Sequence, residues 1–468
     1  MLFTTGTYYV FLIAVFFIYW GIAWRTRLRI GLLLAASCFF YAVIGGRALL
    51  LLVAISAVDF STTRWMNRWS DRTIRRRLLF LSLSVDIGTL CLFKYASFFI
   101  ESVGLTPSAL HLNLAAPIGI SFFIFQSLAY VIDVYREDTE PAADYVDYLA
   151  FVAFFPTIVA GPILRAKQLL PQLRARLMLD STTGGQALFL IAIGLIKKIA
   201  IADYLSANLV ERVFDFPERF SSLEVLAAVY GYALQIYADF SGYSDIAIGS
   251  AMLLGFTLPV NFNAPYRALD LPEFWRRWHI SLSTWLRDYV FFSIAGPRAR
   301  SLMVLYGGLV ATMLIGGLWH GAAWTFVLWG LLHGVGLVTV RAWASLRKRL
   351  AIVRRNTRWS RTASVLITFH FVCFAWVFFR AETVDQAVAL LSQLFTFTTG
   401  TSNLAYPMVV IIALSFIAHW MPDSGFDLAR NGFVRMPAPF QAGVLFALAL
   451  GLYFVASSDV VPFIYSRF

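Results

Sequence analysis

The feature that most constrains this chain is a succession of long apolar stretches with few charges between them. Such stretches recur from residues 8–24 to residues 440–456, and charged residues make up only 14% of the 468 residues. Soluble globular domains carry roughly a quarter charged residues, and a helix needs ~20 apolar residues to cross the hydrocarbon core of a bilayer. The sequence therefore predicts an all-α polytopic membrane protein.

Several apolar runs are too short for a full crossing, for example residues 48–60. Short apolar segments at membrane depth form half-helices or re-entrant segments, which protein or a water-filled cavity must surround. We expect about ten to twelve transmembrane helices on this basis. Because no long polar segment is present to form a soluble domain, we expect a single membrane-embedded domain over residues 1–468.

The net charge of +12 comes from basic residues gathered in short connections between apolar runs. The densest connection, 341–361, holds eight Lys or Arg, whereas 101–115 and 381–403 hold none. Basic connections stay on the cytoplasmic side of a membrane. We therefore expect 101–115 and 381–403 on the outer side, together with both termini, and we interpret the charge as orienting the chain and not as binding nucleic acid.

Residues 261–300 differ from the rest, because charged residues are mixed with tryptophan there. Pro272 and Glu273 suit the first turn of a helix, so we expect an amphipathic helix lying along the membrane interface. At helical spacing, one polar face of that helix would carry Arg276, His279 and Ser283. A neighbouring stripe would carry Trp275, Trp278 and Trp285.

Two interpretations of this helix remain open. Tryptophan and arginine alone indicate a membrane anchor. His279 beside the pair Arg276 and Arg277 also suits a phosphate-bearing ligand, because guanidinium groups bind phosphate bidentately. Under the second interpretation these residues belong to a binding site.

His320 lies in the stretch GGLWHGAAW, inside the nearly uncharged segment 302–340. An ionisable side chain inside a membrane is costly and by default marks a functional site. The neighbours Gly316, Gly317 and Gly321 indicate either close helix packing or room for a substrate. A neutral imidazole there could take a proton from a hydroxyl, so His320 is the first candidate catalytic residue.

The remaining polar residues carry weaker signals. Residues 235–245 (QIYADFSGYSD) form a polar island that should face the protein interior, where Asp239 and Tyr243 either join helices or contact substrate. His333 could line the same cavity as His320, while an interface position explains His419. No histidine pair, cysteine cluster or paired acidic motif has metal-ligand spacing, so we expect no metal.

Two motifs in order resemble a known family. FWRRWHISLSTWLRDYVF (274–291), followed by GGLWHGAAWTFVLWGLLHG (316–334), is similar to the bacterial alginate O-acetyltransferase branch of the membrane-bound O-acyltransferase family. AGPILRAKQLLPQL (160–173) and residues 237–266 resemble the same branch. The resemblance thus covers most of the chain.

The resemblance implies a ring of membrane helices around a central tunnel, in which a cytoplasmic acyl thioester meets an acceptor from the outer face. His320 matches the family's catalytic histidine, and His279 matches the second motif histidine, where other branches carry Asn or Asp. The surrounding motif residues, expected to bind substrate or donor or to line the tunnel, are Trp275, Arg276, Arg277, Trp278, Ser283, Trp319 and Trp324.

The resemblance also implies O-acyl transfer, most simply of acetyl from acetyl-CoA, across a bacterial inner membrane to a hydroxyl acceptor. A periplasmic esterase-like partner protein would then pass the group to an exopolysaccharide, as in alginate biosynthesis, or to a cell-wall polymer. No permanently bound cofactor is expected. Two alternatives stay open: D-alanyl or other acyl transfer from a carrier protein to a wall polymer, and a proton-coupled transporter whose buried histidines relay protons.

Overall fold

The computed structural model describes residues 2–105, 117–352 and 357–456, and within those ranges the regular secondary structure is entirely helical. The expected outward segment 101–115 lies largely outside the described residues. Contacts group the chain into two compact units, Met1–Gly194 with Tyr243–Pro259, and Leu195–Gly242 with Val260–Phe468. The single domain over the whole chain stays a prediction.

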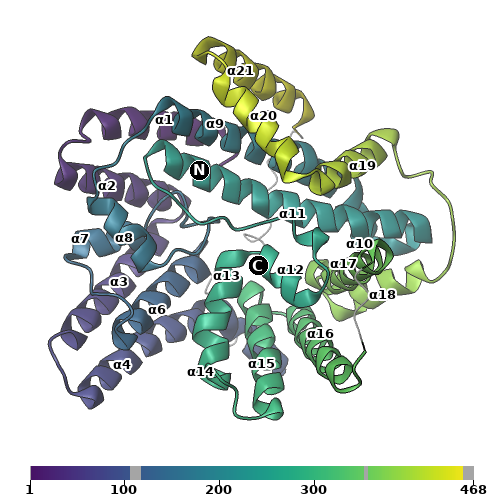
Figure 1. The fold of residues 1–468 in the computed structure, drawn as a ribbon, viewed down its shortest axis with the longest axis horizontal. Helices are drawn as coiled ribbons and strands as arrows, with labels where there is room; N and C mark the ends of the chain where they lie inside the picture. The colour runs from purple at the N-terminus through teal and green to yellow at the C-terminus, as the bar shows by residue number, and fades with distance from the viewer. Residues whose placement is uncertain (1, 106–116, 353–356, 457–468) are drawn as a thin grey trace. The chain divides into compact units, whose positions relative to one another are not determined.

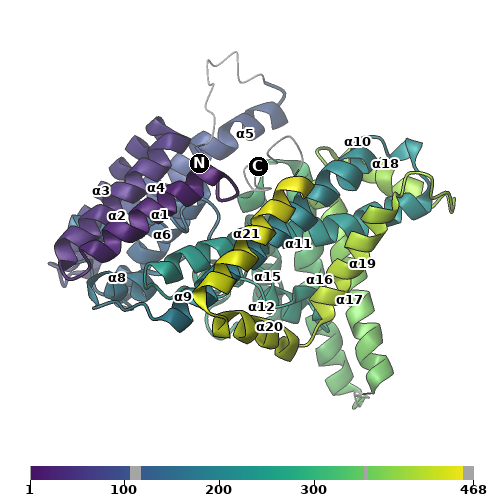
Figure 2. The same ribbon diagram turned by 90° about the horizontal axis from the view of Figure 1, so that it is seen from above.

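The first unit is built from the helices drawn in purple to blue in Figure 1. They are α1 (Gly6–Gly21), α2 (Thr26–Ile44), α3 (Gly46–Met66), α4 (Arg72–Leu90), α5 (Ala96–Ser102), α6 (Ile120–Arg136), α7 (Tyr145–Val152), α8 (Ala166–Arg174) and α9 (Ser181–Leu195). Helices α2, α3, α4 and α6 pack successively against one another and run side by side in Figure 2. The buried Arg29 joins α2 to the end of α8, because its guanidinium donates to the carbonyl of Leu173 at 2.8 Å.

The second unit holds most of the motif residues. Its longer helices are α11 (Ser222–Leu253), whose last residues belong to the first unit, α15 (Leu302–His320), α16 (Trp324–Arg349), α17 (Arg358–Arg380), α18 (Val384–Leu394), α19 (Tyr406–Trp420), α20 (Asp423–Arg435) and α21 (Ala438–Val455). Its short segments include the π-helical η3 (Ile196–Asp203), α10 (Glu211–Asp215), α12 (Leu271–Arg277), α13 (Ile280–Trp285) and α14 (Phe292–Ala295).

By length and composition, seven helices among the described residues could cross a membrane, or eight if α19 and α20, bent by 96°, form one broken span. They are Thr26–Ile44, Gly46–Met66, Arg72–Ser102, Leu302–His320, Trp324–Arg349, Arg358–Arg380 and Ala438–Val455. The number is below the expected ten to twelve because several apolar runs fold as shorter helices, such as the 16-residue α1. The prediction of an all-α polytopic membrane protein is confirmed.

Glycines bring α15 and α16 into close contact, and Figure 1 shows the two helices side by side. A methyl group on Gly330 would lie 2.5 Å from the carbonyl oxygen of Met313, and one on Gly317 would overlap the carbonyl oxygen of Phe326. One on Gly321 would overlap the Phe326 ring. Of the two interpretations of the glycines around His320, the structure therefore favours close helix packing.

Candidate active site

The expected interfacial helix is interrupted at His279 and forms two short helices, α12 and α13. Helix α12 begins where the Asp270 carboxylate accepts the N–H of Glu273 at 2.8 Å. His279 has φ 40°, in the left-handed region that non-glycine residues rarely adopt and that recurs at functional sites. The prediction that Arg276, His279 and Ser283 share one helical face is therefore wrong, because the turn separates Arg276 from the following helix.

Asn261 fixes the orientation and the tautomer of the His279 ring. Its Oδ1 accepts the Ser281 N–H at 3.1 Å and the Ser281 hydroxyl at 2.9 Å, which identifies this atom as an acceptor. The Nδ1 of His279 lies 3.2 Å from the same oxygen, so Nδ1 carries the ring proton. Nε2 is then the nitrogen with the lone pair, which can accept a proton or a hydrogen bond.

His279 is fully buried, and its ring is neutral at physiological pH. Burial lowers the pKa of His279 to about 3, because an imidazolium loses its hydration there. The Phe240 ring meets the imidazole edge-on, with centroids 4.5 Å apart, and Phe262 lies on another side at 6.3 Å. This apolar enclosure keeps His279 in the form that can accept a proton.

An aromatic cluster brings the two motif histidines into one part of the second unit. The Trp319 ring lies 5.9 Å from His279 and 4.9 Å from His320, measured between centroids. His320 is buried at the last position of α15, and its ring lies 5.0 Å from both Trp329 on α16 and Phe379 on α17. Trp319 thus links His279 and His320 in one aromatic cluster, whose other rings include Phe240 on α11 beside His279 and Trp329 and Phe379 beside His320.

His333 belongs to the same cluster, which the sequence suggested without including it among the site residues. Its ring lies 4.9 Å from Trp329 and 5.0 Å from Trp275, and the residue is fully buried. Neither ring nitrogen has a hydrogen-bond partner among the described residues. The signal in the sequence is the i, i+4 spacing of Trp329 and His333, which places both on one helix face. Nothing in the sequence pointed to Asn261.

Comparison with known proteins supplies the family. The sequence model of the membrane-bound O-acyltransferase family matches residues 88–382, more than half of the chain and inclusive of both motif histidines. The chain belongs to the membrane-bound O-acyltransferase family. It is therefore an O-acyltransferase and a multi-pass membrane protein, which confirms the family and the enzyme class expected from the motifs.

Relatives of this O-acyltransferase act on different polymers. The chain is 41% identical over 384 residues to the "Probable alginate O-acetylase" of Azotobacter vinelandii, covering 80% of this chain and 74% of the relative. It is 36% identical over 388 residues to the "Peptidoglycan O-acetyltransferase" of Helicobacter pylori, covering 77% and 72%. It is 28% identical over 291 residues to the "Teichoic acid D-alanyltransferase" of Streptococcus thermophilus, covering 56% and 68%.

Three motif tryptophans of the O-acyltransferase, Trp275, Trp278 and Trp319, belong to the aromatic cluster that holds its histidines. Trp278 is buried with its ring 5.0 Å from Trp376, and the half-buried Trp275 contacts Trp329 at 5.7 Å. Trp319 lies close to both histidine rings. Trp324, in contrast, is 58% exposed at the first turn of α16.

The polar motif residues lie further from the histidine rings or support the backbone. Arg276 is exposed, while Arg277 pairs with Glu273 at 2.8 Å. Ser283 donates its hydroxyl to the Trp278 carbonyl at 3.0 Å and so stabilises the turn at His279. Their contact with substrate or donor stays a prediction.

The two residues expected from the polar island fall in different units. Asp239 accepts from the fully buried Lys198 at 2.6 Å, and the same ammonium group lies 2.6 Å from Asp203. This ion triad favours the interpretation that Asp239 joins helices, here α11 and η3. Tyr243 lies in the first unit, where its ring packs 5.7 Å from Phe3. For both residues a contact with substrate stays a prediction.

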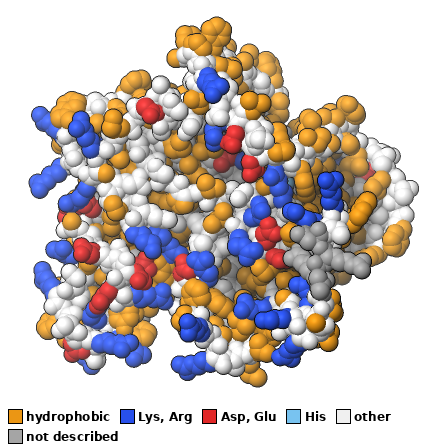
Figure 3. Space-filling model, viewed as in Figure 1, with side chains coloured by type: hydrophobic (Ala, Val, Ile, Leu, Met, Phe, Trp, Pro, Cys, Tyr) orange, Lys and Arg blue, Asp and Glu red, His pale blue; other side chains and the backbone are white. Residues whose placement is uncertain are grey.

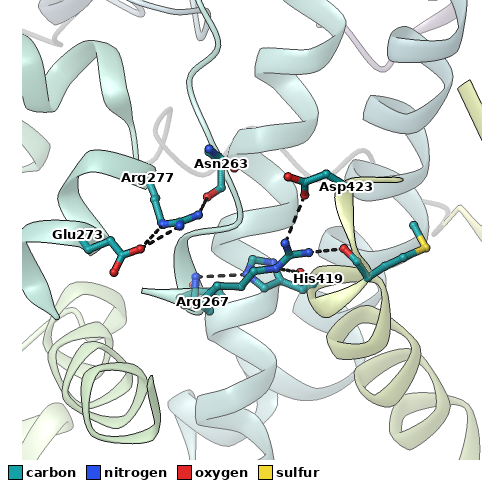
Figure 4. A network of polar contacts seen from close by, with 8 residues as sticks. Asn263, Arg267, Glu273, Arg277, His419 and Asp423 are labelled. Atoms are coloured by element: carbon teal, nitrogen blue, oxygen red, sulfur yellow. Dashed lines mark hydrogen bonds and ion pairs between the residues drawn. The ribbon is translucent and has the colours of Figure 1, made fainter. Parts of the chain in front are cut away.

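His419 is buried, although the sequence suggested an interface position. Its Nε2 accepts the Tyr266 N–H at 3.2 Å, and its carbonyl accepts from Arg267 at 2.8 Å (Figure 4). Among the described residues no group of three or more His, Cys, Asp or Glu side chains is placed to hold a metal ion.

Proposed function

We propose that this O-acyltransferase moves an acetyl group from a cytoplasmic thioester, acetyl-CoA, across a bacterial inner membrane to a hydroxyl acceptor. A periplasmic partner protein would carry the group on to an exopolysaccharide or cell-wall polymer. The observation that carries the proposal is the enclosure of His279 and His320 in one aromatic cluster. The higher identity to the two acetyl-transferring relatives, 41% and 36% against 28% for the D-alanyl-transferring one, favours acetyl.

In the proposed reaction His320 acts as the general base. Its ring takes the proton of the attacking hydroxyl, the hydroxyl oxygen bonds to the thioester carbonyl carbon, and the carbon–sulfur bond breaks. The thiolate then takes the proton from the His320 imidazolium, so the products are an ester and a free thiol. General acid–base assistance of this kind typically contributes ~10²–10⁴ in rate.

His279 has a separate part in this proposal. Asn261 accepts the Nδ1–H of His279, which leaves Nε2 as a hydrogen-bond acceptor. Nε2 then accepts a hydrogen bond either from an N–H of the thioester or from the attacking hydroxyl. Because the ring stays neutral, it contributes a fixed hydrogen-bond acceptor in a buried site, which orients a reactant before the reaction.

Replacing His320 by alanine tests the proposal. We expect His320→Ala to lower acetyl transfer by at least ~10²-fold, since the general base is lost, with normal membrane insertion. The assay follows loss of labelled acetyl from a thioester to a hydroxyl acceptor in proteoliposomes. The matched control is His370→Ala, because His370 already bonds the Tyr230 hydroxyl at 2.8 Å and the Leu366 carbonyl at 2.7 Å.

Two outcomes would contradict the proposal. Full acetyl transfer by purified His320→Ala would remove His320 from the reaction. Movement of a substrate without loss of the acyl label would favour the transporter, and transfer only from a D-alanyl carrier would favour the D-alanyltransferase.

A further inference from the structure

A basic pocket lies beside α12, and its lining includes none of the residues of the aromatic cluster. It has a volume of about 460 Å³ and is lined by three arginines, Arg267, Arg277 and Arg361. Glu273 is the acidic residue of the lining, and Val365, Leu366 and Trp420 form an apolar wall. The volume is within the range of small-molecule sites.

Two of the arginines are held in place by the backbone (Figure 4). Arg267 donates through Nε to the His419 carbonyl at 2.8 Å and through Nη2 to the Met421 carbonyl. Arg277 donates through Nη1 to the Asn263 carbonyl at 3.1 Å and through Nε to Glu273 at 2.9 Å. Fixing these guanidinium groups in advance reduces the entropy lost when an anion binds.

The charges of the pocket lining are not balanced. Partial burial acts to raise the pKa of Glu273, but the Leu269 N–H and Arg277 outweigh burial, and the pKa is lowered. The ionised Glu273 therefore offsets Arg277 alone. Asp423 lies 3.3 Å from Arg267 but is 86% exposed, so solvent screens it. Arg361 makes no ion pair with any residue of the described ranges.

The pocket lies at the ends of two apolar helices, and this position indicates which class of anion it can bind. Arg361 lies in the first turn of the membrane span α17, as the last residue of the most basic connection of the chain, and Trp420 ends α19. Leu366 is 50% exposed and Trp420 42% exposed, so the apolar wall is open at the side of the helices. Basic pockets between membrane helices on the cytoplasmic side are typical of sites for anionic lipid headgroups. The face in Figure 3 carries both basic and acidic side chains, and the basic ones are more numerous.

We propose that this pocket binds the phosphate of an anionic phospholipid, with Arg361, Arg267 and Arg277 around the phosphate and an acyl chain along Val365, Leu366 and Trp420. A water-soluble phosphate compound would match the arginines but would leave the exposed apolar wall uncovered. The site is independent of the reaction proposed for His320.

The test uses the full-length protein reconstituted in nanodiscs containing phosphatidylglycerol and phosphatidylcholine. Retention of each lipid after detergent extraction is measured by native mass spectrometry, and the melting temperature is measured at increasing phosphatidylglycerol. We expect Arg361→Gln to weaken phosphatidylglycerol retention about fivefold, the usual contribution of one basic residue near anionic lipid. Arg361→Lys should weaken phosphatidylglycerol retention less than Arg361→Gln does, because lysine keeps the positive charge.

The matched control is Arg358→Gln, which removes an arginine of the same helix turn that does not line the pocket. It should retain phosphatidylglycerol like the unmodified protein, and so should His320→Ala, which separates this proposal from the proposed reaction. Equal retention in Arg361→Gln and Arg358→Gln would overturn the proposal. The proposal would also be overturned if acetyl-CoA displaced the lipid and if Arg361→Gln raised the KM for the thioester. Those two results together would assign the pocket to the acetyl donor.

Discussion

At the scale of the single residue, one oxygen atom determines how His279 can act. The Oδ1 of Asn261 accepts from the backbone and hydroxyl of Ser281, and therefore compels His279 to donate from Nδ1. The amide of Asn261 accepts this hydrogen bond without adding a charge. Burial is therefore what lowers the pKa of His279 and keeps the ring neutral. Asn261 is thus a positioning residue for His279.

Asn261→Asp should make acyl transfer sensitive to pH. The aspartate can accept the same hydrogen bonds, but its negative charge favours the imidazolium and raises the pKa of His279 from about 3. Activity should then fall as pH is lowered through the new pKa, because the protonated ring cannot accept a hydrogen bond at Nε2. In the unmodified protein the His279 ring stays neutral well below pH 6, because its pKa is lowered by burial. Protonation of His279 should therefore cause no such loss of activity above that pH.

The measurement is the rate of acyl transfer against pH for both proteins in liposomes. Asn263→Asp serves as control, because it adds the same charge at an exposed position two residues away. Identical profiles for Asn261→Asp and the unmodified protein would show that the charge of His279 does not matter for the reaction.

The residues of the site were predictable to different degrees. His320 stood out because an ionisable group in apolar surroundings is costly. His279 stood out because it lies beside Arg276 and Arg277 among the tryptophans of the charged stretch 261–300. Asn261 did not, because it reaches His279 across 18 positions through a loop, and no helical spacing connects them. Asp239 was visible as a buried charge, but its partner Lys198 lies on another element and could not be paired with it from spacing.

At the scale of the element, close packing of α15 and α16 positions His320. The hydropathy of the sequence predicted the long apolar helices well, because each of them reads as a continuous apolar run. It could not predict the turn inside 271–285, since Trp278 and His279 are compatible with a helix and only tertiary contacts hold His279 at φ 40°.

Gly330→Ala should separate the two helices and lower both stability and activity. The added methyl would meet the Met313 carbonyl oxygen at 2.5 Å, and overpacking of this kind costs about 1–3 kcal/mol. The expected result is a lower melting temperature with reduced acyl transfer. Gly307→Ala on α15 is the matched control, since nothing lies within 4 Å of its added methyl, and it should be neutral or slightly stabilising. Equal melting temperatures for the two variants would contradict close packing at Gly330.

At the scale of the whole molecule, the charges of the connections predict how the chain crosses the membrane. Helix α17 passes as one span between the basic connection 341–361 and the segment 381–403, which has no Lys or Arg. Since basic connections stay cytoplasmic, these two segments should lie on opposite sides. The number of crossings was less predictable, because helix breaks in apolar runs leave no mark in hydropathy.

Cysteine labelling in spheroplasts measures this arrangement. With Cys38, Cys91 and Cys373 replaced by alanine, a membrane-impermeant maleimide should label Thr399→Cys in intact spheroplasts. It should label Lys348→Cys only after permeabilisation. Labelling of both positions in intact spheroplasts would mean that α17 does not cross the membrane or that the connection faces outward.

The left-handed backbone at position 279 also limits which amino acids evolution can place there. Asparagine, aspartate and histidine adopt this conformation more readily than other residues with a Cβ, whereas valine, isoleucine and threonine are strongly disfavoured. The resemblance noted above has Asn or Asp at this position in other branches of the family. In this chain, substitution of His279 by asparagine or aspartate would therefore keep the backbone of the turn, whereas a β-branched residue would strain it.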